Sequence, residues 1–325
     1  MIDQQLKQRV MEERMKKYEA MGYRFVGPRK HSAIKICQWC KSSLRDAGYC
    51  YKQKFYDLSS NRCLQMTPTF FVCSENCLFC WRPLRYALPR GQEWDSPKEI
   101  MDSAIEAQRE ILQGFKGNPR TPLRKFEESQ DPKHVAISLS GEPTLYPYIG
   151  ELIDDIHSRG MTAFLVTNGT LPERLQELLD HDQQPTQLYI TLAAPDKETI
   201  KKTALPIFED SWERLQQSLG IMHLFKRSVI RLTLVRNLNF VNPEGYAGLA
   251  EKAQCDFLEV KSFMSVGGAR DRLPYSDMLL FPEIQDFARK IEKASNYKIV
   301  DEKADSRVVL LTNESSTPRS LFFSE

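Results

Sequence analysis

The sequence predicts an α/β fold whose main part is a partial (β/α)6 TIM-like barrel, preceded by a cysteine-rich extension. From Thr67 onward, short runs of β-branched and aromatic residues alternate with longer stretches of helical periodicity. The strand segments are almost continuously apolar, which is typical of parallel strands that helices cover. The alternation fills about 200 residues, a length that suits six units better than the eight of a complete barrel of about 250 residues.

The elements of the barrel are expected in a regular order along the chain. The six strands are expected at residues 69–72, 134–139, 163–167, 187–192, 229–235 and 257–261. The helices between them are expected at residues 97–115, 145–159, 172–180, 196–202, 211–224 and 243–254. Several of these helices begin with proline, whose missing N–H group costs nothing in a first helical turn.

Further elements flank the barrel. Amphipathic periodicity at residues 2–20 predicts a first helix that lies on the rest of the protein, and a helix at 282–294 with strands at 297–300 and 307–312 closes the chain. We therefore divide the chain into a helical, basic and cysteine-rich segment of residues 1–66, a barrel of residues 67–295 and a C-terminal segment of residues 296–325. Residues 116–133 are expected to form a long basic loop, and loops of this length are usually functional or mobile.

The composition excludes several classes of protein. With 41% hydrophobic and 27% charged residues, the chain has the composition of an ordinary globular protein. The first twenty residues are charged and do not form a signal peptide, and no apolar run is long enough to span a bilayer. We expect a cytoplasmic protein that does not enter a membrane and does not depend on a disulfide scaffold.

The net charge of +2 conceals a basic segment near the N-terminus. Residues 22–54 carry eight Lys or Arg against one acid, Asp46, which is a local charge of +7. Cations that follow phosphates, with aromatic rings that stack on unpaired bases, are what recognition of single-stranded RNA requires. A solvated basic face is the alternative. The interleaved aromatic residues are Tyr23, Phe25, Trp39, Tyr49 and Tyr51, and the cations that could extend an RNA footprint are Arg82, Arg85, Arg90 and those of residues 116–133.

Three cysteines lie in a tight loop directly after the first expected strand. Cys73, Cys77 and Cys80 form a Cys-x3-Cys-x2-Cys motif. Three thiolates at this spacing can hold three irons of a [4Fe–4S] cluster and leave the fourth iron open for chemistry. The alternative is a zinc site that pairs Cys37 and Cys40 with Cys77 and Cys80, although it leaves three cysteines of the same region unexplained.

A second group of cysteines precedes this loop. Cys37, Cys50 and Cys63 are separated by thirteen residues each. They would hold a second cluster with one open iron, although ligands so far apart meet only through folded loops. Cys40 remains a spare that could replace Cys37 as a ligand, and Cys255 is interpreted as a small core residue.

Further motifs follow the expected strands. Ser140-Gly141-Glu142-Pro143-Thr144 comes after the second strand, Thr167-Asn168-Gly169-Thr170 after the third, and the fifth contains Arg231 and leads to Asn237. Together with the Cys-x3-Cys-x2-Cys loop, these motifs resemble the radical S-adenosylmethionine superfamily, and they lie where parallel barrels build active sites. The residues that the resemblance implies for binding S-adenosylmethionine are Gly141, Glu142, Thr144, Thr167, Asn168, Arg231 and Asn237.

One family of this superfamily, the archaeal-type tRNA 4-demethylwyosine synthases, is similar over about residues 35–282. The similarity rests on the two cysteine groups, on Cys50-Tyr-Lys52, on Cys77-Leu-Phe-Cys80-Trp-Arg-Pro and on Phe257-Leu-Glu-Val-Lys-Ser262. The resemblance implies a carbon–carbon lyase that joins two carbons of pyruvate to N1-methylguanosine beside the anticodon of tRNA(Phe). The product would be 4-demethylwyosine, the tricyclic base made in the second step of wybutosine biosynthesis.

The same resemblance implies cofactors and partners. Two [4Fe–4S] clusters are expected, one on each cysteine group, together with S-adenosylmethionine on the Cys73 cluster. Lys52 is expected to form a Schiff base with pyruvate, and the alternative is a lysine that faces solvent or phosphate. Because some relatives carry a flavodoxin-like domain that this chain lacks, we expect an external electron donor of the flavodoxin or ferredoxin type, and a monomer. Glu259 and Lys261 share a strand face, where they line the site or form an ion pair.

Two other functions stay open at this stage. One is a different radical S-adenosylmethionine enzyme that modifies tRNA, such as a methylthiotransferase. Those enzymes usually carry a C-terminal RNA-binding barrel, for which the tail after Ser306 is too short. The other is a zinc-stabilised RNA-binding protein without catalytic activity.

Overall fold

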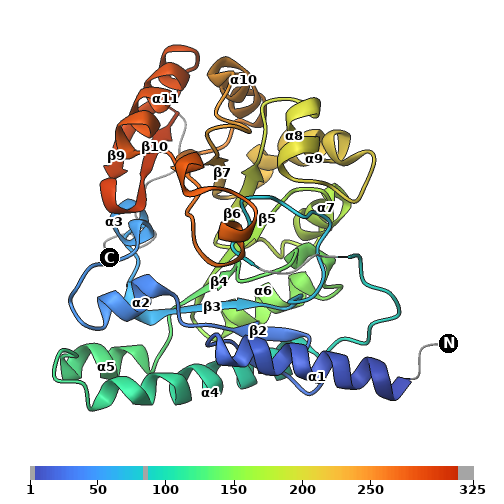
Figure 1. Ribbon diagram of the computed structural model, residues 1–325, viewed down its shortest axis with the longest axis vertical. Coiled ribbons are helices and arrows are strands. Elements are labelled where there is room, and N and C mark those ends of the chain that lie inside the picture. The colour runs from blue at the N-terminus through green and yellow to red at the C-terminus, as the bar shows by residue number, and fades with distance from the viewer. Residues whose placement is uncertain (1–3, 83–86, 314–325) are drawn as a thin grey trace.

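A curved ten-stranded sheet forms the centre of the protein (Figure 1). The structure is a computed structural model that describes residues 4–82 and 87–313, with side chains from Arg9 onward. The strands lie in the order β1-β2-β3-β4-β5-β6-β7-β8-β10-β9. Each neighbouring pair from β3 to β8 is parallel, and the pairs at both edges are antiparallel. Within the described ranges β1 and β9 do not pair with each other, so the six parallel strands form an open, partial barrel and confirm the predicted fold class. The strands are β1 (Arg24–Val26), β2 (Ser32–Ile34), β3 (Cys63–Thr67), β4 (His134–Ile137), β5 (Thr162–Thr167), β6 (Gln187–Leu192), β7 (Ser228–Leu234), β8 (Phe257–Ser262), β9 (Lys298–Lys303) and β10 (Val308–Thr312).

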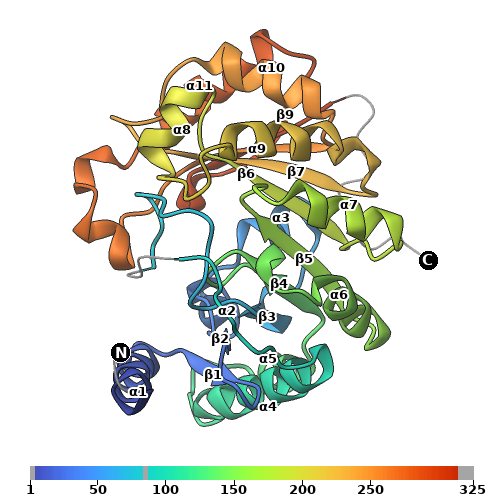
Figure 2. The ribbon, with the colours of Figure 1, turned by 90° about the vertical axis from the view of Figure 1, so that its right-hand side faces the viewer.

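Helices form a layer on the outer side of the sheet (Figure 1, Figure 2). Their starts follow local rules: Ser96 caps α4 by accepting a hydrogen bond from the Glu99 N–H group, and Pro97 occupies the first turn. In the described part of the chain no helix is long and apolar enough to cross a membrane. The helices are α1 (Gln4–Ala20), α2 (Gln38–Ser43), α3 (Tyr51–Tyr56), α4 (Pro97–Lys116), α5 (Leu123–Ser129), α6 (Ile149–Ser158), α7 (Pro172–Asp180), α8 (Lys197–Thr203), α9 (Ser211–Gly220), α10 (Pro243–Ala253) and α11 (Phe281–Lys293).

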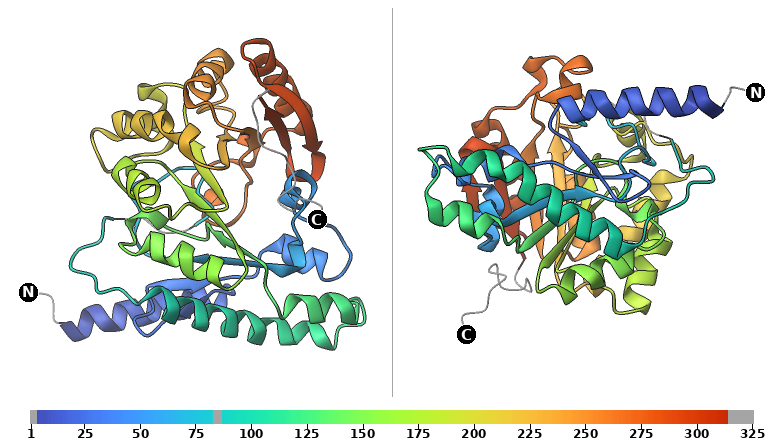
Figure 3. Two further views of the ribbon diagram at one scale, coloured as in Figure 1. Left: turned by 180° about the vertical axis from the view of Figure 1, so that it is seen from behind. Right: turned by 90° about the horizontal axis from the view of Figure 1, so that it is seen from below.

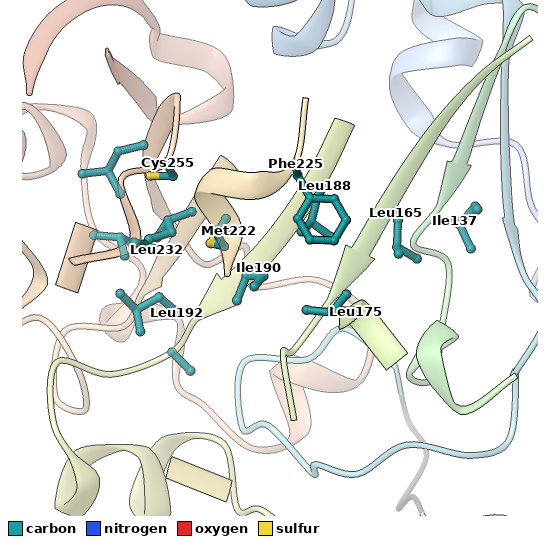
Figure 4. Close-up of a cluster of buried hydrophobic side chains, with 14 of the residues drawn as sticks. Ile137, Leu165, Leu175, Leu188, Ile190, Leu192, Met222, Phe225, Leu232 and Cys255 are labelled. Carbon is teal, nitrogen blue, oxygen red and sulfur yellow. The ribbon is translucent and has the colours of Figure 1, made fainter. Parts of the chain in front are cut away.

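The main hydrophobic core lies between the outer face of the sheet and the helices α4 and α6 to α11. Strand residues such as Leu165, Ile190 and Leu232 are fully buried against helical residues such as Leu175 (Figure 4). Complete burial of a leucine contributes about 1.5–3 kcal/mol, so this core accounts for much of the stability of the barrel. Cys255 belongs to the same cluster, as predicted.

The inner face of the sheet has a smaller core, and α3 packs against it. Tyr51, Phe55 and Tyr56 of α3 are buried against Phe164 of β5 and Tyr189 of β6. Because side chains alternate along a strand, the polar residues of β7 and β8 that share a face with the apolar ones of this cluster also face α3. The short helix therefore brings residues 50–56 to the inside of the barrel.

The N-terminal helix α1 is attached mainly at its C-terminal end. Tyr18 is buried and contacts Phe70 edge to face, with ring centroids 5.1 Å apart. Val10 and Met11 remain exposed, and the helix extends beyond the rest of the molecule (Figure 3). The predicted helix that lies on the protein is therefore present, although most of its side chains from Arg9 onward are exposed.

A buried histidine joins β2 to the segment before α4. His31 donates its Nδ1–H to the Pro68 carbonyl (2.7 Å), and its Nε2 accepts the backbone N–H of Asp95 (2.8 Å). The buried Asp95 carboxylate also pairs with Arg29. Burial lowers the pKa of His31, since the Asp95 carboxylate compensates only part of the cost of a buried charge.

Two expectations about secondary structure are wrong. Residues 69–72 form a turn, and the first parallel strand is β3, which lies earlier, at Cys63–Thr67. The reason is tertiary, because the Phe70 and Phe71 rings pack on Phe25 and Tyr18 and satisfy the apolar run without a strand. Residues 116–133 are not a continuous loop either, since they contain α5.

Candidate active site

The Cys-x3-Cys-x2-Cys loop lies beyond the C-terminal end of β3. Cys73 is buried, and Cys77 and Cys80 are partly exposed. Burial raises the pKa of the Cys73 and Cys77 thiols, and neighbouring carboxylates and the Cys80 thiol raise it further. Thiols that repel one another in a buried loop become thiolates when a metal compensates their charge, so the three residues fit an iron–sulfur cluster.

Backbone hydrogen bonds fix the shape of this loop. The N–H groups of Asn76 and Leu78 donate to carbonyls of residues 204 and 203, each at 2.9 Å. On another side, the Arg272 guanidinium donates to the carbonyls of Leu78 and Cys80. The cysteines are thus held by two segments that follow later strands of the barrel.

Glu142 is the centre of a hydrogen-bond network next to the loop. Its carboxylate accepts from the N–H group (3.1 Å) and hydroxyl (2.7 Å) of Thr144, the Thr167 hydroxyl (2.7 Å) and the Asn168 N–H group (2.8 Å). Burial raises the pKa of Glu142, and these hydrogen bonds act in the opposite direction. The network joins the motif after β4 to the motif after β5.

The same two motifs contact the cysteine loop directly. The side-chain amide of Asn168 donates to the Ser74 hydroxyl (2.8 Å) and approaches the Cys73 sulfur (3.9 Å). Gly141 has a φ of +69°, and a Cβ atom there would lie 1.8 Å from the Thr69 carbonyl oxygen. Only glycine fits this position, which packs the Ser140–Thr144 motif onto the segment before the cysteines.

The three cysteines of the second group each lie at the start of a secondary-structure element. Cys37 caps α2, and its sulfur accepts the Cys40 N–H group at 3.3 Å. Cys50 precedes α3, and Cys63 is the first residue of β3. Burial, together with the neighbouring Cys37 thiol, raises the pKa of Cys50 to about 11. Burial also raises the pKa of Cys63, as do Cys37 and Cys50. The three thiols are therefore electrostatic neighbours although they are far apart in sequence.

Cys40 is more deeply buried than these three, although Cys37 and Cys63 also raise the pKa of its thiol, after burial itself. Its side chain is fully buried with Ile36, Leu44 and Leu112, and its thiol lies 3.9 Å from the Asn61 carbonyl oxygen. Cys37, Cys50 and Cys63 are partly exposed. The structure thus places Cys40 in the apolar core beside the group.

The two Cys-x2-Cys pairs of the zinc alternative lie in different places. Cys37 and Cys40 pack with Ile36 and Leu44 around α2. Cys77 packs against the main core, and Cys80 packs against the aromatic cluster that contains Tyr18, Tyr23 and Phe70. Among the residues with described side chains, no three His, Cys, Asp or Glu converge as the ligands of one metal ion do. A [4Fe–4S] cluster distributes its thiolates over different irons, and each cysteine group is compatible with that arrangement.

Lys52 lies beside the second cysteine group on the inner face of the barrel. Its ammonium group is 4.2 Å from the ring centroid of Tyr189 and 4.9 Å from that of Phe164. Burial, together with the neighbouring Arg231 cation, lowers the pKa of Lys52 to about 8. Cys50 and Cys63 act in the opposite direction, so the amine, the two thiols and Arg231 are close together.

Arg231 belongs to this inner site and not to the network around Glu142. Its Nε donates to the fully buried carboxylate of Glu259 (2.9 Å), and its Nη2 donates to the Tyr51 hydroxyl (2.7 Å). The hydroxyls of Tyr51 and Tyr56 donate to the same carboxylate at 3.0 and 2.9 Å. Glu259 therefore forms an ion pair with Arg231, whereas the predicted alternative paired it with Lys261.

Two other predicted residues lie at the edges of these sites. Lys261 donates to the Ser306 carbonyl (2.8 Å), and burial lowers its pKa to about 8. Asn237 is exposed and donates to the Asp277 carboxylate (2.5 Å), close to apolar residues that also contact Leu78 and Phe79. The structure thus brings five of the seven expected S-adenosylmethionine residues together near Cys73, with Arg231 and Asn237 in other places.

The basic segment is only partly available for RNA. Tyr23, Phe25 and Tyr51 are core residues, so their expected stacking on bases is wrong. Tyr49 is 41% exposed, and together with Trp39 it lies under the Lys303 ammonium group. Among the arginines of the expected footprint, Arg82 is buried against Tyr23, Arg90 is exposed, and Arg85 lies outside the described residues.

Several residues of both sites carry no sequence signal. Phe164 and Tyr189 line the inner site from ordinary apolar strand runs, and Tyr56 joins them from a mixed polar and aromatic segment. Ser74 and Thr170 link the cysteine loop to the motif after β5 through a 2.6 Å hydrogen bond. Ser74 lies within the cysteine motif and Thr170 directly after Thr-Asn-Gly, so the sequence indicates that each is near a functional motif. That the two residues contact each other follows only from the fold.

Two family models match the chain over most of its length. Residues 67–250 match the model described as "Radical SAM superfamily", and residues 252–313 match "Wyosine base formation". Two solved structures match over 98% of this chain and 99% of theirs: "Structure of TYW1 with a lysine-pyruvate adduct bound" (36% identity, TM-score 0.82) and "Crystal structure of archaeal TYW1" (33%, 0.76).

Relatives named S-adenosyl-L-methionine-dependent tRNA 4-demethylwyosine synthase are similar over nearly the whole chain. The protein from Pyrococcus abyssi is 48% identical over 91% of this chain and 87% of its own. The protein from Methanocaldococcus jannaschii is 39% identical over 87% of this chain and 91% of its own. Together with the cysteine loop on a partial barrel, these similarities show that the chain belongs to the tRNA 4-demethylwyosine synthase family of the radical S-adenosylmethionine superfamily.

Proposed function

We propose that this protein is an enzyme that condenses N1-methylguanosine beside the anticodon of tRNA(Phe) with two carbons of pyruvate to form 4-demethylwyosine. The observation that carries the proposal is the arrangement of two separate cysteine groups, with Lys52 beside the second, on one partial barrel. Family membership supports S-adenosylmethionine, an iron–sulfur cluster and a tRNA substrate. The lyase class, pyruvate and a second cluster are the finer parts of the proposal.

We assign the first cluster to Cys73, Cys77 and Cys80. When bound, such a cluster supplies the electron that cleaves S-adenosylmethionine to a radical. Backbone contacts from later strands hold the three cysteines in place. Gly141, Glu142, Thr144, Thr167 and Asn168 are proposed to bind S-adenosylmethionine beside it, because their network lies against this loop.

The main role that we propose for the Glu142 network is to fix the shape of the S-adenosylmethionine site. Few of its polar groups are free to bind the ligand directly. Both carboxylate oxygens already accept hydrogen bonds from the chain. Glu142 therefore holds the loops after β4 and β5 in one geometry, and its remaining acceptor capacity is available to an ammonium group. Asn237, which lies on another loop, is a peripheral candidate for the same ligand.

We assign the second cluster to Cys37, Cys50 and Cys63, and the pyruvate site to Lys52. The amine lies between aromatic faces, where burial favours its neutral, nucleophilic form. The surrounding rings exclude water from an imine at this position. Cys40 is left out of the ligand set because it is packed in the core.

The remaining parts of the proposal concern partners. The exposed ring of Tyr49, the Trp39 ring and nearby cations are candidates for contact with unpaired bases of the tRNA. An external flavodoxin- or ferredoxin-type protein is the proposed electron donor, and the protein is proposed to act as a cytoplasmic monomer. The divisions at residues 66 and 295 separate the second-cluster segment, the barrel and the C-terminal strands.

One anaerobic assay tests the function. The reconstituted enzyme is incubated with N1-methylguanosine-containing tRNA, pyruvate, S-adenosylmethionine and a reductant, and the nucleosides are analysed by mass. We expect a new nucleoside with the mass of 4-demethylwyosine, and none without pyruvate. Cleavage of S-adenosylmethionine without this product would reject the condensation while leaving the radical chemistry intact.

A further inference from the structure

One side of α1 is apolar but only partly covered by the rest of the protein. Met11, Met15 and Tyr18 follow one another at helical spacing, so they share one side of the helix. Tyr18 is buried and Met15 is partly buried, whereas Met11 is 39% exposed and the neighbouring Val10 is 48% exposed. The side that anchors α1 therefore continues as an exposed apolar stripe where the helix extends beyond the rest of the molecule (Figure 3).

This stripe ends next to the first cysteine loop. The Arg14 guanidinium lies over the Phe71 ring, 5.7 Å from its centroid. Phe71 is partly exposed and stacks on Phe25, with ring centroids 5.5 Å apart. It packs in the same hydrophobic cluster as Cys73, which follows two residues later. A molecule that contacts Arg14 and Phe71 from outside is thus two residues along the chain from a proposed ligand of the first cluster.

The charges of α1 are segregated around the stripe. Val10, Arg14 and Lys17 follow one another at helical spacing, which places two exposed cations along one edge of the apolar residues. Glu12 and Glu19 share the opposite edge by the same spacing. The edge that lies over Phe71 is therefore the basic one, because it carries Arg14.

The composition of this face fits a protein partner better than RNA. Recognition of unpaired bases requires exposed rings, and the aromatic residues Tyr18, Tyr23 and Phe25 are all buried. Exposed methionine and arginine side chains are instead enriched at protein interfaces. Residues 9–24 carry five Lys or Arg against three Glu, so electrostatic complementarity selects an acidic partner.

We propose that this α1 face, formed by Val10, Met11, Arg14, Lys17 and Phe71, is the docking site of an acidic electron-transfer protein that reduces the first cluster. The inference rests on the proposed function and deepens it, because it assigns a surface to the external electron donor. One electron leaves the reduced donor and enters the cluster, and no bond forms or breaks. A donor seated here lies against the segment that leads into the first cysteine loop, which keeps the path of the electron short.

Stopped-flow kinetics with a reduced donor protein tests the proposal. Reconstituted holoenzyme is mixed anaerobically with a reduced acidic flavodoxin or, separately, with a reduced acidic ferredoxin, and electron transfer is followed by absorbance. Dithionite is the parallel reductant, because so small a molecule needs no docking surface. Binding of the oxidised donors, which transfer no electron, is measured by surface plasmon resonance. We expect the second-order rate constant of wild type to fall as the ionic strength rises, because salt screens the attraction.

Two variants of the α1 face are compared with matched controls. Arg14→Glu should lower the rate constant and the affinity for the donor protein about 5- to 30-fold, because a repulsion of similar size replaces an attraction. Val10→Asp should lower both about tenfold, because it removes an apolar contact. The controls are Arg289→Glu on α11, which lies at the other end of the molecule, and Val241→Asp, whose valine is 45% exposed; both should behave as wild type does. Dithionite should reduce every variant at the rate of wild type.

Several results would overturn the inference. Wild-type rates in Arg14→Glu and Val10→Asp, or a wild-type enzyme that neither donor protein reduces, would reject this docking site. Equal losses with dithionite would show that the substitutions disturb the cluster itself. Unchanged donor rates with weakened binding of tRNA would assign the face to RNA, and unchanged donor rates with dissociation of a dimer would assign it to a second copy of the chain.

The docking site and the proposed function fail in different ways. Formation of 4-demethylwyosine with dithionite is measured on the same samples, since this reaction does not depend on the donor protein. Absence of the nucleoside in wild type would reject the proposed function, whatever the donor rates are. Normal formation with dithionite in Arg14→Glu, together with slow reduction by flavodoxin, would support the docking site.

Discussion

Replacement of Gly141 by alanine tests how tightly the first cysteine loop depends on the motif after β4. The added Cβ atom would lie 1.8 Å from the Thr69 carbonyl oxygen and 2.4 Å from that of Val72. These are backbone atoms of the segment that leads into Cys73, so a rotamer change cannot relieve the clash. Gly160 is a matched control, because its φ is also +69° but no atom lies within 4 Å of its added Cβ.

The two substitutions separate backbone strain from steric conflict. A left-handed backbone costs a non-glycine residue about 1–2 kcal/mol, which is the whole expected effect of Gly160→Ala. Overpacking adds about 1–3 kcal/mol at Gly141. The entropy of unfolding of 325 residues is about 0.7 kcal/mol per kelvin. A loss of 1 kcal/mol in the free energy of unfolding therefore lowers Tm by about 1.5 °C. We expect Tm to fall by about 2–3 °C for Gly160→Ala and by about 3–7 °C for Gly141→Ala.

Calorimetry and ligand binding provide the assay. Both variants are reconstituted anaerobically, their Tm is measured by calorimetry, and S-adenosylmethionine binding is measured by equilibrium dialysis. Gly141→Ala should weaken binding at least tenfold, because the loop cannot keep its position, and Gly160→Ala should bind as wild type does. Equal Tm losses, or normal binding by Gly141→Ala, would refute the close packing that we describe.

The remaining predictions concern the second cysteine group and the acid stability of the fold. Cys50→Ala should lower the iron content per chain to about half while cleavage of S-adenosylmethionine survives, whereas Cys40→Ala should retain the full iron content. Both contents are measured by iron and sulfide analysis. A full iron content in Cys50→Ala would contradict the proposed ligand set. The free energy of unfolding should fall as the pH drops below about 6.5, because the pKa of His31 is lowered in the folded state and the unfolded chain takes up the proton more readily. His31→Asn does not titrate, so its urea unfolding should show a flatter pH dependence between pH 7 and 5, and an unchanged slope would assign the acid sensitivity to other groups.

The barrel could be predicted because its signals are local. The strand at Gln187–Leu192 and the helix at Pro172–Asp180 match the expected ranges, and most other elements differ by a few residues at their ends. Apolar runs of strand length between proline-started helices determine these elements almost alone. The first strand is predicted in the wrong place because Phe70 and Phe71 have strand composition. In the fold Phe70 is buried and Phe71 half-buried by aromatic contacts with Tyr18 of the distant helix α1.

The sites could be predicted only where chemistry is concentrated in a motif. The cysteine spacings, and for Lys52 the family resemblance, point to the groups that we propose to be reactive. The partners of Arg231 could not be predicted, because Tyr51, Glu259 and Arg231 lie on three elements that meet only in the folded barrel. The resemblance of its strand to a family motif predicts a role in binding S-adenosylmethionine, whereas the described contacts of Arg231 are with Glu259 and Tyr51.

The position of β3 has a consequence for how deeply the substrate must enter. Cys63 begins this strand and the Cys73 loop follows its other end, so the two proposed clusters are attached near opposite ends of one five-residue strand. Such a strand spans about 17 Å, comparable to the radius of a small domain. If both clusters act on one nucleoside as we propose, its base has to reach the inside of the barrel between them. Such a base would have to leave its anticodon stack before it reacts, as in other enzymes that flip a nucleotide into a pocket.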